Sequence, residues 1–99
     1  MTDKATLVVT ALPNPDEMTA VQTYLTGVMP LLMQAGGKLV KRQKVYEVIK
    51  GRPSGMVLVM DFDSSKAVSD LFASDAYSDL IAVREKGFSD MNIIITGDM

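Results

Sequence analysis

Residues 56–62 read MVLVMDF, and this run decides the fold because of the segments on either side of it. Five apolar residues in succession, with valine and leucine among them, predict a β-strand. The preceding cluster GRPSG, at residues 51–55, is rich in turn-forming residues. Before that cluster, Leu39 to Ile49 has the pattern of a long strand interrupted by polar residues. The two runs predict a β-hairpin in the middle of the chain.

A helical segment is predicted after the hairpin. Asp63, Ser64 and Ser65 are all residues that cap helix N-termini. Ser74 and Asp75 have the pattern of a fresh N-cap, so we expect this segment to be broken into two pieces. Gly87 is expected to end the second piece.

Another helical segment is predicted before the hairpin. The residues NPDE at 14–17 form a complete helix start, in which Asn14 caps, Pro15 takes the first helical position and Glu17 closes a capping box. Gly36 and Gly37 are expected to end this helix. Because proline lacks an N–H donor, we expect a kink or restart between Gly27 and Pro30.

Two further strands complete the pattern, one at each end of the chain. They are TLVVTAL at Thr6 to Leu12 and MNIIITG at residues 91–97. The order is therefore β-α-β-β-α-β in a single domain over residues 1–99. This order predicts an α+β fold of the ferredoxin-like type, with a four-stranded antiparallel sheet and two helices on one face.

The strands predict a homodimer. Three runs have no polar residue, which suggests apolar side chains on both faces of the sheet: Leu7 to Val9, Met56 to Met60, and Ile93 to Ile95. Both helices are needed on one face, so the other face would remain an apolar surface in water. We expect a second copy of the chain to cover it, sheet against sheet. The alternative is that these short runs reflect strand propensity alone.

The composition excludes several kinds of chemistry. The chain has no cysteine and no histidine, which rules out a thiolate nucleophile, a histidine base and histidine-ligated haem or zinc. We therefore expect no cofactor and no metal site. The apolar run near the N-terminus is too short for a signal peptide, and no run is long enough to cross a bilayer. These features favour a cytoplasmic protein that does not bind membranes.

Several motifs resemble the family called domain of unknown function 1330, in the dimeric α/β-barrel superfamily. They are GGKL after the first helix, the hairpin glycine Gly51, MDF before a helix that carries Ala67, and the closing IIITGD. The most specific part is S-x-x-Y-x-x-L-x-x-x-R in residues 74–84. The resemblance implies two ferredoxin-like subunits joined through their sheets as a dimeric α/β barrel. It implies no particular activity, since the family has no established common one. The hairpin VYEVIKGRPSG is longer than the family's usual turn.

Arg84 is the strongest candidate for a functional role. Tyr77, Leu80, Ile81 and Arg84 follow the spacing of an inward-facing helical stripe, in which an arginine is out of place. In superfamily subunits a cleft usually lies between this helix and the sheet. There Arg84 could bind an anionic ligand while Tyr77 and Tyr24 donate hydrogen bonds. The alternative is a structural ion pair with an internal acid, for which the candidates are Asp61, Asp63 and Asp98.

The basic segment from Lys38 to Arg52 holds six cations and one acid, a charge of +5, while the rest of the chain carries −7. Apart from Tyr46 it lacks the aromatic residues of nucleic-acid surfaces, so we expect no nucleic-acid binding. Lysines that protect an edge strand from aggregation explain it well.

Three functions are consistent with these features. The first is a small homodimeric protein whose helix–sheet cleft binds a small anionic or aromatic ligand. The second is a cofactor-free enzyme, of the monooxygenase or isomerase kind, that acts on a small enolisable or aromatic acid. The third is a non-catalytic assembly module.

Overall fold

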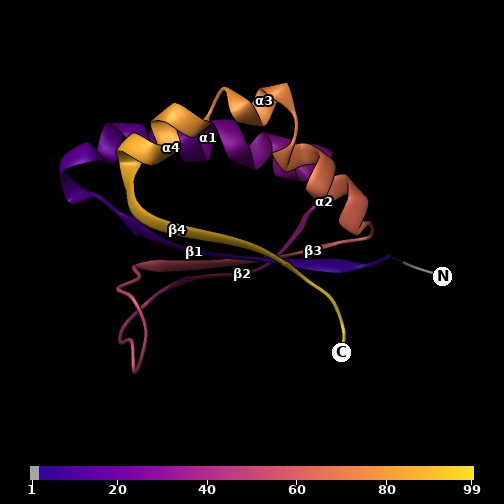
Figure 1. The fold of residues 1–99 in the computed structure, drawn as a ribbon, viewed down its shortest axis with the longest axis horizontal. Helices are drawn as coiled ribbons and strands as arrows, with labels where there is room; N and C mark the ends of the chain where they lie inside the picture. Colours follow the sequence, from indigo (N-terminus) through magenta and orange to yellow (C-terminus); the bar gives the residue numbers. More distant parts are fainter. Residues whose placement is uncertain (1–2) are drawn as a thin grey trace.

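One four-stranded antiparallel sheet carries all the helices on a single face (Figure 1). The computed structural model describes residues 3–99. The strand order across the sheet is β2-β3-β1-β4. This is the predicted ferredoxin-like arrangement. Its elements are β1 (Ala5–Pro13), the 3₁₀ turn η1 (Pro15–Glu17), α1 (Met18–Gln34), β2 (Lys38–Lys44), β3 (Met56–Phe62), α2 (Ser65–Phe72), α3 (Asp75–Ser78), α4 (Ile81–Gly87) and β4 (Phe88–Thr96).

The predicted caps and helix ends are confirmed, except that Glu17 does not close a capping box, because the N–H of Asn14 donates to the carbonyl of Gly87 (2.8 Å). The side chain of Asn14 accepts from the backbone N–H of Asp16 at the start of η1. Ser64 and Ser74 cap α2 and α3 in the same way, so each hydroxyl satisfies a backbone donor that has no partner within its helix. Gly36 follows α1 with φ = 92°, a conformation that glycine adopts without strain.

The helices differ from the predictions in two details. The helix α1 does not restart near Pro30 but runs through it without a break. Pro30 and Thr26, one turn before it, are both exposed, so water can bond the carbonyl that proline leaves unpaired. The second helical segment has three pieces instead of two, because the chain breaks again at Leu80, between α3 and α4.

The hairpin also differs from the prediction. The strand β2 ends at Lys44, five residues before the expected end at Ile49. Residues 45–55, which we call the arm, form neither helix nor strand, and the N–H of Val45 donates to the carbonyl of Gly55 (2.9 Å) where the arm closes. The arm projects from the sheet on the side opposite the helices (Figure 1).

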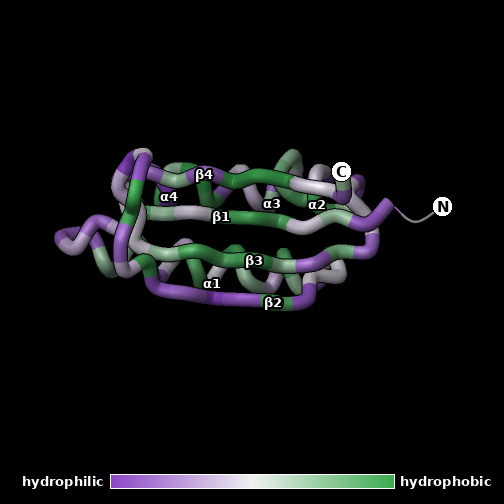
Figure 2. Tube along the Cα trace, turned by 90° about the horizontal axis from the view of Figure 1, so that it is seen from below, coloured by the Kyte–Doolittle hydropathy of each residue, from purple (hydrophilic) through white to green (hydrophobic). Residues whose placement is uncertain are grey.

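The side of the sheet without helices, here called the open face, is less apolar than the three runs suggested. Alternate residues of each run point to the helices, which leaves Val8, Val57, Val59 and Ile94 on the open face. Polar residues flank these four: Thr6, Thr10, Asp61 and Asn92. A central apolar band therefore crosses β3, β1 and β4 on the open face. These three strands are hydrophobic at their centres in Figure 2, whereas most of β2 is hydrophilic.

The core lies between the other face of the sheet and the helices. Its fully buried side chains are Leu7, Met60 and Val68, one each from β1, β3 and α2. Val21, Val28 and Leu32 contribute the buried stripe of α1. None of the helices in residues 3–99 combines the length and apolar character that crossing a bilayer requires.

The close approach of α4 to α1 generates a testable prediction. A Cβ at Gly87 would lie 2.9 Å from the backbone nitrogen of Val21 and 3.1 Å from the carbonyl carbon of Ala20. Because backbone atoms cannot move aside cheaply, Gly87→Ala should lower the free energy of unfolding by about 1–3 kcal/mol. Urea denaturation measures this. Gly97→Ala is the control, since no heavy atom lies within 4 Å of its Cβ position. Equal stability of the two variants would contradict the prediction.

Candidate ligand-binding site

The structure brings Tyr24, Tyr77 and Arg84 into one hydrogen-bonded chain. The guanidinium of Arg84 donates through Nη1 to the hydroxyl of Tyr77 (3.0 Å). That hydroxyl lies 2.9 Å from the hydroxyl of Tyr24. Both tyrosines are buried, and the side chain of Arg84 is 23% exposed. The chain of contacts therefore leads from the surface into the space beneath the helices.

Local structure sets the position of Tyr77 and Arg84. The hydroxyl of Ser74 accepts from the backbone N–H of Tyr77, which fixes the start of α3. The break at Leu80 then re-orients the chain, so Tyr77 and Arg84 lie on separate helical segments and still meet. The same break turns Ile81 outward to 37% exposure, which contradicts its predicted place on the inward stripe.

Aromatic contacts hold the two tyrosine rings in place. Tyr24 packs edge-on against Phe88, with ring centres 5.5 Å apart. Tyr77 packs edge-on against Phe72 at 4.8 Å. Each such pair stabilises the fold by about 0.5–1.5 kcal/mol beyond the contribution of the surface area that it buries. The hydroxyls are thus presented by rings that have little freedom to move.

Burial and hydrogen bonds determine the protonation of Tyr24 and Arg84. Burial raises the pKa of Tyr24 far above its ordinary value, and the hydrogen bond with Tyr77 raises that pKa further. The hydrogen bond to Glu85 raises the pKa of Arg84. At neutral pH Tyr24 is therefore a neutral hydroxyl and Arg84 is a cation.

The acid that pairs with Arg84 is Glu85, its neighbour in sequence, at 2.8 Å from Nη2. The expected partners Asp61, Asp63 and Asp98 instead line a separate cleft at the other end of the sheet, so that prediction is wrong. The side chain of Glu85 is 67% exposed. An ion pair this exposed contributes little, about 0–1 kcal/mol, and an incoming anion can replace Glu85 at small cost.

Arg84 lines a surface pocket of about 260 Å³ at the edge of β4. Behind it lies an apolar void of about 30 Å³, which is room for about one water molecule. Phe88, Met91 and Ile93 line both spaces and so form the wall between them. Tyr24, Met29 and Met56 line the void from α1 and β3. A methionine-rich lining adapts its shape readily, so this wall can deform.

Counting donors shows that the tyrosine pair has capacity for a further bond. The two hydroxyls supply two hydrogens, and the contact between them uses one. Arg84 can only donate, so it accepts neither. Among the hydrogen bonds of residues 3–99 the second hydrogen has no acceptor. Neither hydroxyl lines the Arg84 pocket, and apolar atoms line the void next to Tyr24, so a ligand reaches this hydrogen only if the wall between the two spaces moves.

Other residues of this pocket had weaker sequence signals. Neither Glu85 nor Asp90 belongs to a sequence pattern that marks it as a site residue. The carboxylate of Asp90 forms an ion pair with Nε of Arg52 in the arm (3.2 Å). Residues 3–99 contain no group of three or more acidic side chains placed to hold a metal ion.

The fold and this site define a ferredoxin-like α+β protein with a pocket between a helix and the sheet edge. A family profile matches residues 5–98 and carries the description "Domain of unknown function (DUF1330)". The chain therefore belongs to the DUF1330 family. No curated protein matches it.

Several solved structures share the fold. The RPA0582 protein of unknown function from Rhodopseudomonas palustris is 16% identical with a TM-score of 0.80, covering 98% of this chain and 83% of that one. A dimeric ferredoxin-like protein of unknown function from Bacteroides fragilis is 9% identical with a TM-score of 0.62, and 97% of each chain is covered. A Nitrosomonas europaea protein named "Putative antibiotic biosynthesis monooxygenase" is 10% identical with a TM-score of 0.62, covering 100% and 93%. These likenesses establish the fold and no activity.

The weak partner of Arg84 leads to a stability prediction. Arg84→Ala removes an exposed ion pair and one hydrogen bond, so it should lower the free energy of unfolding by only about 1 kcal/mol. Tyr77→Phe should cost more, about 1–3 kcal/mol, because it leaves the buried hydroxyl of Tyr24 without a partner. Thermal or urea denaturation of both variants makes the comparison. A larger loss in Arg84→Ala than in Tyr77→Phe would indicate that Arg84 neutralises an internal charge.

Proposed function

We propose that the protein is a homodimer that binds a small organic anion with an aromatic or apolar body in the pocket of Arg84. The carboxylate or enolate of the ligand replaces Glu85 on the guanidinium. The body of the ligand displaces the wall of Phe88, Met91 and Ile93 and enters the apolar void below. The observation that carries this proposal is the chain of hydrogen bonds from Arg84 through Tyr77 to Tyr24, whose apolar part lines that void.

The charges around the pocket support an anionic ligand. Asp90 also lines the pocket and by itself would repel an anion. Its ion pair with Arg52 offsets that charge, so Glu85 is the acid that an incoming anion has to displace from Arg84. A planar guanidinium holds a carboxylate through two parallel hydrogen bonds once Glu85 has moved away. The spare tyrosine hydrogen provides a second polar contact further inside.

The protonation of Tyr24 favours binding over catalysis. Because its pKa is strongly raised, Tyr24 stays a neutral hydroxyl at neutral pH, which can donate a hydrogen bond but provides no phenolate to act as a base. The groups in this pocket that could abstract a proton from an enolisable acid are the carboxylates of Glu85 and Asp90, and both are held in ion pairs. A cofactor-free oxygenase or isomerase is the second candidate, and the shared fold of the monooxygenase-named neighbour is the observation in its favour.

The homodimer forms through the open face. Val8, Val57, Val59 and Ile94 make an apolar band that the helices of the same chain cannot reach. A structural neighbour of the same fold is dimeric. A stable interface buries about 1,600 Å² in total, and a four-stranded sheet face supplies area of that order.

Ligand binding is tested with benzoate and a series of larger aromatic and aliphatic carboxylates in a thermal-shift screen. A binder should stabilise the wild type by about 2.7 kcal/mol at a hundredfold excess over its Kd. The same compound should have no effect on Arg84→Ala. Lys86→Ala is the matched control, since Lys86 is an exposed cation two residues away, 3.8 Å from Glu17, and does not line the pocket.

A shift that persists in Arg84→Ala places the ligand elsewhere and contradicts the proposed site. Conversion of a bound carboxylate by the wild type, and not by Arg84→Ala, would establish the enzymatic alternative. Product analysis by mass spectrometry after incubation in air distinguishes that outcome from binding alone.

The homodimer is tested by Ile94→Asp. Ile94 is exposed in the single chain, so an aspartate there costs a monomer little but would bury a charge in the sheet-to-sheet interface. Sedimentation should show wild-type dimers at micromolar concentration and Ile94→Asp monomers with an unchanged circular dichroism spectrum. Ala82→Asp on the exposed side of α4 is the control and should remain dimeric. A wild type that sediments as a monomer would overturn this part of the proposal.

A further inference from the structure

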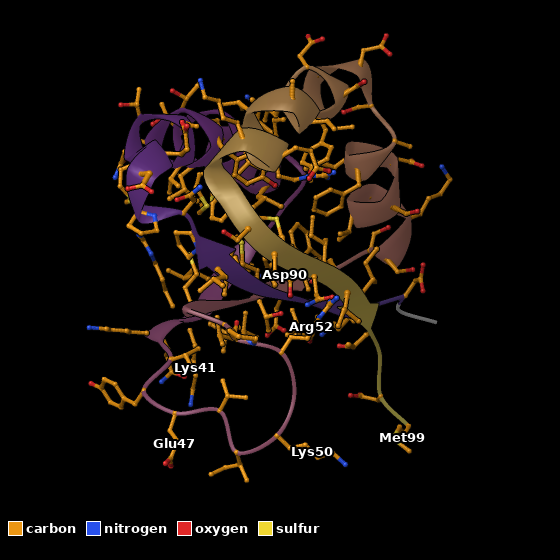
Figure 3. The ribbon with its side chains drawn as sticks, turned by 60° about the vertical axis from the view of Figure 1, so that its left-hand side comes forward. Lys41, Glu47, Lys50, Arg52, Asp90 and Met99 are labelled. Carbon is orange, nitrogen blue, oxygen red and sulfur yellow. The ribbon has the colours of Figure 1, made fainter. Side chains whose placement is uncertain are left out.

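The arm (residues 45–55) holds apolar side chains that its own chain leaves uncovered. Tyr46 is 94% exposed and Ile49 is 88% exposed. Two large apolar side chains on one projecting segment indicate a contact surface rather than scattered exposure. The outer part of the arm, marked by Glu47 and Lys50, lies away from the sheet, whereas Arg52 reaches back toward Asp90 (Figure 3).

We propose that in the homodimer the arm of each subunit packs against the partner beside the mouth of the partner's Arg84 pocket, so that two chains build each pocket. The inference rests on the proposed homodimer, because it requires a second sheet on the open face. The molecule that covers the exposed side chains of the arm is therefore a second copy of this chain.

The length of the arm fits this role. Two sheets packed face to face lie about 10 Å apart. A loop of this length that folds back on itself reaches at most about 17 Å, since about five residues span roughly 3.3 Å each. The arm leaves the sheet on the open-face side (Figure 1). Its outer residues therefore reach the level of the partner's sheet.

Charge determines how the two sheets are oriented. The strand β2 is exposed along its whole length and carries Lys38, Lys41, Arg42 and Lys44 without any acid. A two-fold axis across the strands would stack β2 on the partner's β2, with the open-face cations Lys38 and Lys41 of each copy opposed. An axis along the strands stacks β2 on the partner's β4 instead, whose only charged residue is Asp90. The second arrangement avoids the repulsion.

The strand register then places the arm. It leaves the sheet between Lys44 and Met56, and Met56 lies level with Ala11 and, through it, with Met91 of β4. With the axis along the strands, the same ends of both sheets coincide. The arm of one copy therefore lies beside the beginning of the partner's β4. Ser89 and Asp90 line the mouth of the Arg84 pocket at that point.

The absence of cysteine from the natural sequence makes a cross-linking test specific. Chains with Tyr46→Cys are mixed with chains that carry Ser89→Cys and a longer tag, exchanged to equilibrium, and treated with a short bis-maleimide. A covalent heterodimer on a denaturing gel can form only between chains. The control mixture pairs Tyr46→Cys with Asp98→Cys, which lies beyond the opposite end of β4. Circular dichroism confirms that each variant is folded.

We expect heterodimers to be at least tenfold more abundant in the Ser89 mixture than in the Asp98 mixture. The reverse preference would overturn the proposed orientation. Heterodimers in neither mixture, from a wild type that sediments as a dimer, would overturn the role of the arm and leave the homodimer standing. A double variant that carries both Tyr46→Cys and Ser89→Cys tests the opposite case. If it cross-links within one chain and the mixtures give no heterodimers, the arm covers its own pocket. A monomeric wild type would refute both inferences.

Discussion

The antiparallel pairing of β1 with both β3 and β4 is the constraint on which the rest of the structure depends. This pairing places Leu7 level with Met60 on one side and with Ile95 on the other. Because side chains alternate along a strand, one register decides every residue that faces the helices. A shift by one residue would expose Leu7 and bury Thr6 with its bond to Asp61.

The candidate site depends on that core through β4. Phe88 and Met91 lie on the core side of β4, where they close the space beneath Tyr24. The tyrosine pair satisfies its polar atoms largely within itself, which is the condition for burying hydroxyls at acceptable cost. Arg84 is the charged member of the hydrogen-bonded group that it forms with Tyr77 and Tyr24. Glu85 keeps that charge paired at the surface.

The arm connects the site to the open face. Arg52 binds Asp90 at the pocket and also donates to Asn92 (3.2 Å), which lies on the open face. One arginine therefore links the two surfaces that the proposed functions use, the anion pocket and the dimer interface. Assembly and ligand binding would be coupled through this contact, since both depend on the same segment.

Local chemistry in the sequence was sufficient for the element order and the helix ends. Asn14, Ser64 and Ser74 act through bonds to residues two or three positions away, so their roles can be predicted without tertiary contacts. Short apolar runs rich in β-branched residues likewise predicted the strands of the sheet. The sequence also marked Tyr24, Tyr77 and Arg84 as candidates, because an arginine and tyrosines at inward positions conflict with simple core packing.

Only the tertiary structure decided how these residues meet. The break at Leu80 separates Tyr77 from Arg84 in helical phase, and the long-range contact between Tyr24 and Tyr77 joins residues 53 positions apart. The choice of Glu85 over Asp61, Asp63 and Asp98 depends on which end of the sheet each acid occupies. The sequence therefore determined what each segment becomes, while packing determined the site, because distances between segments follow from the register of the sheet and not from local bonds.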